Sequence, residues 1–412
     1  MSQGTPSEPT TTEAGPLSGV RVVDVTRHMS GPYASLVLGD FGADVIKVES
    51  APFGDPSRRT GVNFVEGEST MFLTWNRSKR SICLDMRAKA GLEIAHRLVD
   101  SADVFMENYR PGVADEIGLG WEVLQKRNER LIYCSTNAFG SSGPWRARPG
   151  TDPVVQAMSG VMSVTGERDG GPVLVGIPIA DYTASLITVQ GILLALLARD
   201  RTGRGQYVEI PMVGGLIFGL TTRVGPYFQT GENPTKWGSQ HSQVVPYQAF
   251  RTSDGWAVAG VWGDGWKKFC LALGRPELAT DERFDEDAKR VERRDELTEL
   301  LQELFITRTT AEWDTDFSAN GVLFAPVNSF SDALENEQSK AMGFVTEIDH
   351  PVSGRLRQVA PVIRMSDTPA AVTLPPPLLG QHSREILEEI GFSDGQVEGL
   401  LADGTIMETS DR

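Results

Sequence analysis

Residues 20–48 read VRVVDVTRHMSGPYASLVLGDFGADVIKV, and this stretch decides the fold class. Its two ends, 20–25 and 43–48, are short runs of mainly β-branched apolar residues, which is typical of buried strands. Between them Ser30-Gly31-Pro32 opens a helix, because serine is a favoured N-cap and proline is tolerated in the first turn. A strand, a helix and a second strand in this order predict a βαβ unit with two parallel strands.

The same alternation continues to about residue 210. Single helices are predicted at 88–99, 121–127 and 182–199. The further predicted strands lie at 82–84, 103–106, 131–135 and 206–210. We therefore expect an α/β fold with a mostly parallel sheet in a large domain.

The pattern changes after about residue 225. A loop-like stretch at 226–245 precedes two short strands, 247–251 and 256–261, whose Ser253-Asp254-Gly255 connection predicts a hairpin. Charged helical segments follow at 282–305 and 311–317, and a capped helix is predicted at 383–390. The expected organisation is a disordered tail at 1–15, a large domain at 16–225, a small α+β domain at 226–330, and a return segment at 331–412 that completes the large domain.

The net charge limits the possible partners. Against 39 Lys and Arg stand 55 Asp and Glu, which gives a formal net charge of −16. Such an acidic chain is poorly suited to bind nucleic acid or anionic lipid.

The cysteines and histidines give no sign of a disulfide scaffold or a metal site. The three cysteines include no CxxC pair, and the five histidines include no HExxH pattern. No apolar run reaches the ~20 residues of a membrane span and no signal peptide is recognisable, so we expect a cytoplasmic protein.

A dinucleotide-binding unit is one alternative for the first βαβ unit, since Glu49 closes its second strand. The turn TRHMSGP (26–32) lacks the GxGxxG spacing through which a backbone approaches a pyrophosphate, so NAD binding is poorly supported. No GxSxG elbow or Walker A loop is present. The helix start after Ser30 can present N–H groups to a ligand, although an ordinary capped helix explains it equally well.

Basic side chains gather near the ends of predicted strands: Arg77, Lys79, Arg80, Arg87, Arg110, Arg146 and Arg148. At the edge of an α/β sheet such groups can bind phosphates, but each taken singly is also typical of a solvated surface charge. The segment ENYRPG (107–112) follows a strand and suits a site at the carboxyl edge of the sheet.

Asp181 precedes the long predicted helix and follows an apolar stretch at 173–180. Helix capping, worth about 1 kcal/mol, explains an acid in this position. A carboxylate beside the N–H groups of a helix start also stays ionised, which favours use as a nucleophile. The residue pattern alone leaves both readings open.

Read together, several ordered segments resemble the family III CoA-transferases, the family that includes formyl-CoA transferase and carnitine CoA-transferase. The resemblance covers about residues 16–406. It rests on LSGV (17–20), GPY (31–33), GADVIKVE (42–49), NRSKRS (76–81), ENYRPG (107–112), TGRGQ (202–206) and PLLGQH (377–382).

The resemblance implies a Rossmann-like large domain, a small domain, and a homodimer of two interlocked subunits. It assigns the nucleophile to Asp181. It assigns CoA contacts to the first turn, to a strand end, to the ENYRPG segment and to the loop before the next helix: Met29, Ser30, Leu84, Asp85, Met86, Arg87, Asn108, Tyr109, Arg110, Arg148 and Asp152. The chain departs from the family at Ser50 and Glu116, where members often carry basic residues.

The segment 239–250 (SQHSQVVPYQAF) is more similar to the succinate–hydroxymethylglutarate branch than to formyl-CoA transferase. A dicarboxylic donor such as succinyl-CoA is therefore expected, and Arg58, Arg59 or His241 could pair with its distal carboxylate. The stretch 226–245 is either a lid that excludes water or a simple interdomain linker.

The mechanism implied by the resemblance passes through an aspartyl anhydride and an aspartyl-CoA thioester on Asp181, and CoA is a substrate and not a cofactor. No cofactor or metal is expected. The runner-up is an α-methylacyl-CoA racemase, which needs a histidine where this chain has Thr151, and threonine does not transfer an α-proton at neutral pH. A non-catalytic CoA-binding subunit is the alternative from a different class.

Overall fold

The computed structural model describes residues 15–409, so the predicted disordered tail at 1–15 falls almost entirely outside the described residues. The chain divides into two compact units. Unit 1 comprises Met1–Val161, Gly176–Thr222 and Ala341–Arg412, and unit 2 comprises Met162–Val175 and Arg223–Lys340. Unit 2 is longer at both ends than the predicted small domain at 226–330 and adds the segment 162–175.

Unit 1 is built on one seven-stranded sheet with the strand order β14-β5-β2-β1-β6-β7-β8. Its strands are β1 (Arg21–Asp24), β2 (Asp44–Ser50), β5 (Arg80–Leu84), β6 (Val104–Glu107), β7 (Ile132–Asn137), β8 (Tyr207–Pro211) and β14 (Ile406–Met407). All neighbours pair in parallel except β14, which runs antiparallel to β5. The predicted α/β fold with a mostly parallel sheet is confirmed.

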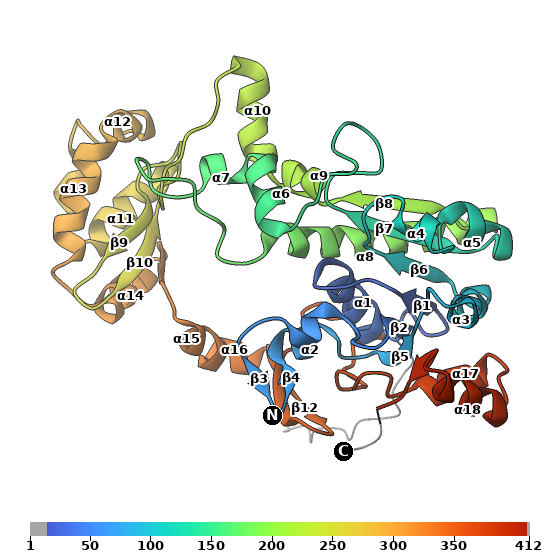
Figure 1. Cartoon of the computed structure of the whole chain (residues 1–412). Coiled ribbons are helices and arrows are strands. Elements are labelled where there is room, and N and C mark those ends of the chain that lie inside the picture. The colour runs from blue at the N-terminus through green and yellow to red at the C-terminus, as the bar shows by residue number, and fades with distance from the viewer. Residues whose placement is uncertain (1–14, 410–412) are drawn as a thin grey trace. The chain divides into compact units, whose positions relative to one another are not determined.

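Helices cover both faces of this sheet, because successive strand residues point to opposite sides. Val22 packs with the helices α1 and α8, whereas the neighbouring Val23 packs with α3, α5, α17 and α18. The helices of unit 1 are α1 (Ser30–Asp40), α2 (Thr70–Trp75), α3 (Lys89–Asp100), α4 (Val113–Glu116), α5 (Trp121–Arg127), α6 (Asp152–Ser159), α8 (Ile179–Thr202), α9 (Met212–Gly219), α17 (Ser383–Glu389) and α18 (Asp394–Ala402). In Figure 1 the red helices α17 and α18 lie beside the blue elements β5 and α3, so distant parts of the chain complete one unit.

Three short elements extend unit 1: the turn η1 (Pro56–Arg59) and the small hairpins β3–β4 (Phe64–Val65, Glu68–Ser69) and β12–β13 (Val345–His350, Gly354–Val359). Three unit boundaries fall within α7 (Val161–Val164), α10 (Thr221–Thr230) and α16 (Glu337–Ala341), and the fourth, between Val175 and Gly176, lies in the loop before α8.

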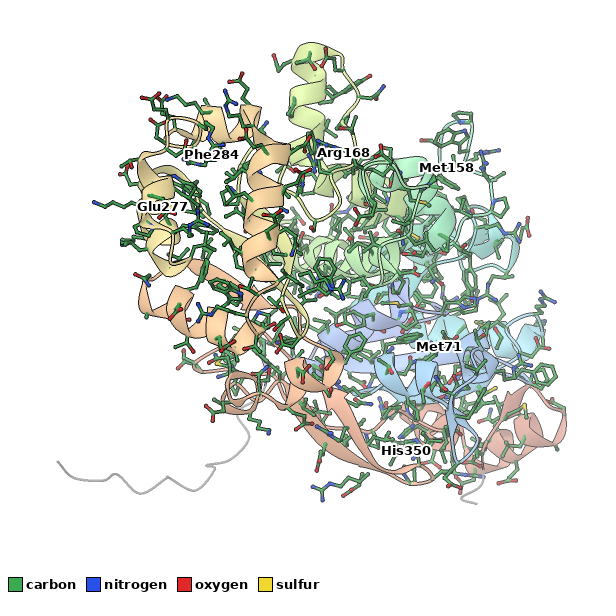
Figure 2. All side chains as sticks on the ribbon, turned by 90° about the vertical axis from the view of Figure 1, so that its left-hand side faces the viewer. Met71, Met158, Arg168, Glu277, Phe284 and His350 are labelled. Carbon is green, nitrogen blue, oxygen red and sulfur yellow. The ribbon has the colours of Figure 1, made fainter. Side chains whose placement is uncertain are left out.

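Unit 2 contains a three-stranded antiparallel sheet with the order β11-β10-β9. Its elements are β9 (Tyr247–Arg251), β10 (Trp256–Gly260), η2 (Gly263–Gly265), α11 (Trp266–Ala272), η3 (Pro276–Thr280), α12 (Asp287–Glu292), α13 (Arg294–Phe305), α14 (Thr310–Ala319), β11 (Leu323–Pro326) and α15 (Phe330–Glu335). The predicted β9–β10 hairpin is confirmed. The core is aromatic: Phe250 stacks on Phe305 at 4.5 Å, and Phe284, labelled in Figure 2, is fully buried in it.

One part of the predicted loop at 226–245 is helical. Helix α10 continues to Thr230 and contains Pro226, which sequence reasoning took as a loop residue. Gly231 follows the last residue of the helix; its positive φ of 73° is the left-handed conformation, and its N–H donates to the carbonyl of Tyr227. Pro226 therefore lies inside this helix and Gly231 ends it, so the two residues do not indicate a continuous loop.

Helix α8 also has the length and mean hydropathy (1.5) of a membrane span. Its buried side chains, among them Ala184, Ile192 and Ala195, belong to the core formed with the sheet and α1. A core helix of this kind meets the same criterion, so its composition alone does not indicate a membrane protein.

Candidate functional site

The turn between β1 and α1, residues 26–30, is held rigidly at the carboxyl edge of the sheet. The Asp24 carboxylate accepts from the N–H of Thr26 at 2.8 Å, and Lys47 Nζ donates to the Thr26 carbonyl at 3.0 Å. The Asn108 side chain bridges the Arg27 backbone, with Oδ1 accepting at 2.8 Å and Nδ2 donating at 2.7 Å. His28 takes a positive φ of 65°, which a residue with a side chain rarely adopts. The surrounding contacts therefore fix a backbone shape that the local sequence does not favour.

Beneath this turn lies a network of fully buried charges. Lys47 Nζ is 2.9 Å from an Asp55 carboxylate oxygen, and Lys79 Nζ is 3.7 Å from Asp24. Burial alone would raise the pKa of the Asp55 carboxyl. The positive charge of Lys47 and hydrogen bonds from Lys47 and Ser57 outweigh burial and lower this pKa from the usual 3.8 to about 2. Burial lowers the pKa of Lys79 to about 7 despite the nearby Asp24, and its Nζ donates to the Pro32 carbonyl at 2.8 Å. These ion pairs support the turn from the strands next to it.

Asp181 lies in the first turn of α8, three residues after the Pro178 N-cap position. The start of α8 approaches the start of α1, because Ser185 Oγ is 2.7 Å from both the Ser30 and the Asp181 carbonyl oxygens. Burial raises the pKa of the Asp181 carboxyl to about 6, the Asp152 charge adds to this rise, and a hydrogen bond from the Ser30 side chain opposes it. The carboxylate is thus half-buried and ionised above about pH 6, as a nucleophile requires.

Asp152 has a structural part in this arrangement. It is buried at the start of α6, and its carboxylate accepts from the N–H groups of Ala180 at 2.7 Å and Asp181 at 3.3 Å. It therefore satisfies two N–H groups in the first turn of α8, the role that sequence analysis considered for Asp181 itself. The predicted contact of Asp152 with CoA stays a prediction.

A cavity of about 430 Å³ lies at the same edge of the sheet. It brings together a group of the predicted CoA contacts, namely Leu84, Asp85, Met86, Arg87 and Tyr109. The Arg27 guanidinium, which sequence reasoning missed, also lines this cavity and lies 4.7 Å from the centre of the Tyr109 ring. Two arginines, an aromatic ring and apolar walls suit a phosphorylated nucleotide portion. Ser50 lines the cavity where family members often carry a basic residue.

The remaining predicted contacts are distributed around this cavity. Met29 and Ser30 belong to the held turn, and Asn108, the residue directly after β6, supports that turn. Arg110 lines a neighbouring cavity of about 220 Å³ together with the buried Glu107, whose pKa burial raises to about 7. Arg148 is exposed in the loop after β7 and does not line the larger cavity.

Several basic residues considered for anion binding are engaged with carboxylates of the same chain. Arg77 pairs with Asp40 at 2.7 Å, and Arg80 pairs with Asp44 at 2.8 Å. Arg58 makes two bonds of 2.8 Å to the buried Glu49 and is not available to a substrate carboxylate. Arg59 lies over the Phe53 ring, and His241, in unit 2, stacks on Tyr247. The carboxylates that hold Arg77 and Arg80 lie 37 and 36 residues away in the sequence, so composition and spacing gave no sign of them.

Comparison with known proteins identifies the family. The model of CoA-transferase family III matches residues 17–383. The chain belongs to CoA-transferase family III. The succinyl-CoA:glutarate CoA-transferase of Mus musculus is 39% identical over 393 residues, which cover 95% of this chain and 90% of the relative. The succinate–glutarate CoA-transferase of Agrobacterium fabrum is 35% identical and covers 91% of this chain and 96% of its own length.

Solved structures agree with the family assignment. A CAIB/BAIF family protein from Brucella suis superposes with a TM-score of 0.83 at 36% identity and covers 92% of this chain and 100% of its own. Rv3272 from M. tuberculosis superposes with a TM-score of 0.80 at 32% identity and covers 90% of this chain and 98% of its own. The predicted family, its succinate branch and the enzyme class are confirmed: the protein is a CoA-transferase.

Proposed function

We propose that this CoA-transferase moves CoA from succinyl-CoA to a second dicarboxylic acid through covalent intermediates on Asp181. The observation that carries the mechanism is the half-buried, ionisable carboxylate of Asp181 in the first turn of α8, beside the held turn that precedes α1. The substrate class is supported by the names of relatives. The mouse and Agrobacterium fabrum proteins are named for glutarate, and a Chloroflexus aurantiacus relative, 34% identical, for succinyl-CoA and D-citramalate.

The transfer consists of four balanced exchanges. The Asp181 carboxylate attacks the thioester carbonyl and the C–S bond breaks. CoA departs as the thiolate, and a mixed anhydride of Asp181 and the donor acid forms. The thiolate attacks Cγ of Asp181, which releases the donor acid and forms an aspartyl-CoA thioester. The acceptor carboxylate attacks the same carbon, expels the thiolate and forms a second mixed anhydride, between Asp181 and the acceptor. The thiolate finally attacks the acyl carbon of the acceptor, which gives the new acyl-CoA and restores the Asp181 carboxylate. Each exchange replaces one activated acyl bond by another, so every barrier is smaller than that of direct transfer.

Water must be excluded while the anhydride exists, because hydrolysis would waste the thioester. Backbone N–H groups near Asp181 are the proposed donors to the oxyanion that forms at each step.

A substrate panel tests this function. We expect succinyl-CoA with glutarate or another dicarboxylate to give the new acyl-CoA and free succinate in equal amounts, followed by mass spectrometry. Monocarboxylates of similar length serve as the matched controls and should react at least about tenfold more slowly. Exchange of solvent deuterium at the α-carbon of a branched acyl-CoA without CoA transfer would select the racemase instead. CoA binding without any turnover would select the binding subunit.

We also propose that the chain forms a homodimer, interlocked as the family resemblance implies. The helices α8 and α9 pack together and leave large apolar side chains exposed, with Leu194 67% and Phe218 77% accessible. Apolar surface of this kind is typical of an interface. Light scattering after gel filtration should give the mass of two chains, and Leu194→Glu with Phe218→Glu should lower it towards one. A monomeric wild type at micromolar concentration would contradict the dimer.

We propose that the protein works in a reducing compartment, the cytoplasm, because all three cysteines are free and buried.

A further inference from the structure

The cavity of about 220 Å³ beside the ENYRPG segment lies on the other face of the seven-stranded sheet from Asp181. Its lining residues come from this segment, from α4 and α5, and from β7, β8 and the loop after β7. Thr136 of β7 faces α8, because its Oγ1 is 2.9 Å from Thr188 Oγ1. The neighbouring Ser135 therefore points to the opposite face, where it lines the cavity. The sheet thus separates this cavity from the helix that carries Asp181.

Three aromatic rings that contact one another line the cavity. The rings of Tyr133 and Tyr207 are stacked with their centroids 5.5 Å apart, and the Trp121 ring lies 6.0 Å from Tyr133 and 6.2 Å from Tyr207. The face of an aromatic ring carries negative partial charge and attracts cations, while its carbon atoms pack against alkyl groups. This part of the cavity therefore suits a positively charged group with apolar substituents.

The charged side chains that line the cavity are mostly carboxylates. Glu107 is only 5% exposed, and one of its oxygens accepts from the Tyr109 N–H at 2.7 Å. Within residues 15–409, neither Glu107 nor Asp115, which also lines the cavity, forms an ion pair. Arg110 is the basic residue among the lining side chains, and it is exposed. Two carboxylates against one guanidinium give the cavity a negative balance of charge.

The pKa of Glu107 reflects the lack of a basic partner from this chain. Burial raises this pKa to about 7, and the charges of Asp115 and Glu209 add to the rise. A buried carboxylate without a cation favours its protonated form. A cation bound beside Glu107 would favour the ionised form instead, and would compete with the proton near neutral pH.

We propose that this cavity binds a small organic cation, namely an ammonium group with short alkyl substituents. The Glu107 carboxylate pairs with the charge, and the rings of Trp121 and Tyr207 hold the alkyl groups. The volume is below the roughly 300–1,000 Å³ of sites for drug-sized ligands, so the cavity suits a compact ligand. A metal ion is disfavoured, because the described residues contain no group of three His, Cys, Asp or Glu side chains that could hold one. The site does not depend on Asp181.

Calorimetric titration with choline at constant ionic strength tests this site. At pH 8 we expect wild type to bind choline with a dissociation constant of about 1 mM or lower. The uncharged isostere 3,3-dimethylbutan-1-ol has the same shape and should bind at least about tenfold more weakly. Protonated Glu107 offers no charge to the ligand, so the affinity for choline should fall about tenfold between pH 8 and pH 6.

Three variants separate the parts of the site. Glu107→Gln keeps an oxygen that can accept from the Tyr109 N–H but removes the charge, so the affinity for choline should fall at least about tenfold and lose its pH dependence. Tyr207→Leu removes one ring and should weaken binding about threefold. Glu122→Gln removes an exposed charge of α5 outside the cavity, and as the matched control it should bind choline like wild type.

Equal affinity of wild type for choline and its isostere, or unchanged affinity in a folded Glu107→Gln, would overturn the proposal. Binding of choline by Arg110→Ala but not by wild type would also overturn it, because the guanidinium of Arg110 would then be the cation of this cavity. If Glu107→Gln does not fold, Asp115→Asn takes its place and should weaken binding about threefold. Wild-type affinity that stays the same from pH 6 to pH 8 would equally reject the role of Glu107.

Discussion

Asp181→Asn should lose at least about 10⁴-fold in kcat for CoA transfer while it still binds CoA. The amide has nearly the shape of the carboxylate but offers no anionic oxygen to the thioester carbonyl. The cavity near Arg27 and Tyr109 is unchanged by this substitution, so the dissociation constant of CoA should stay within about threefold of wild type. Steady-state kinetics and calorimetric titration with CoA give the two values. Asp169→Asn, at an exposed position in another loop, is the matched control and should retain full activity.

Heavy oxygen in the acceptor acid follows the covalent route. Attack of a labelled acceptor on the aspartyl thioester puts one labelled oxygen between the two carbonyl carbons of the anhydride. When the CoA thiolate attacks the acyl carbon of the acceptor, the bond from this carbon to the bridging oxygen breaks, and the labelled oxygen stays on Asp181. In the next turnover the released donor acid carries this oxygen away. Peptides that contain residue 181 should therefore carry the label in wild type. A variant with a tenth or more of wild-type activity, or unlabelled peptides after many turnovers, would reject the covalent mechanism.

Lys47→Met should lower the free energy of unfolding of unit 1 by about 3–5 kcal/mol. Lys47 is fully buried and 2.9 Å from Asp55, so its removal leaves the Asp55 charge buried without its cation. Hydrogen exchange at increasing urea, followed on peptides from β1, β2 and β5, measures the loss within this unit. Lys126→Met, at an exposed position of α5, is the matched control and should change stability by less than about 0.5 kcal/mol.

The double variant Lys47→Met, Asp55→Asn separates the charge from the packing. The amide introduced at position 55 would keep an acceptor for the Ser57 N–H without a buried charge, so we expect the double variant to be more stable than Lys47→Met alone. The pKa of Asp55 in the folded protein, about 2, lies below its unfolded value. The stability from this pair is thus complete above about pH 4 and lost as the pH falls towards 2. Equal stability of the single and double variants would contradict a charge effect.

The sequence was informative where structure is local. Strand and helix order in residues 20–210 follows from alternating apolar runs and capping residues, and it predicted the parallel sheet. Asp181 could be singled out because its position at a helix start is visible in the chain, and the family motifs assigned it a role. Local pattern failed at Pro226, since a proline inside a helix is an exception that the neighbouring residues do not reveal.

Long-range pairing was beyond the sequence. Lys47 lies within a strand that reads as apolar, and its partners Asp24 and Asp55 become visible only when β1, β2 and the following loop meet. Arg80 was considered for phosphate binding, but it pairs with Glu385 and Glu389 from the far end of the chain. The pKa of Asp181 likewise depends on Asp152 and Ser30, which come from two other helices.

One of the two edge strands of the main sheet, β14, is formed by Ile406 and Met407 and pairs with β5, which comes much earlier in the chain. During synthesis on the ribosome, the open side of β5 therefore emerges long before the strand that covers it. Helices α17 and α18, which bury one face of the same region, are translated equally late. An unpaired strand edge invites pairing with other chains. Nascent copies of this enzyme should consequently need chaperone protection until residues 383–407 have emerged, and termination before them should favour aggregation.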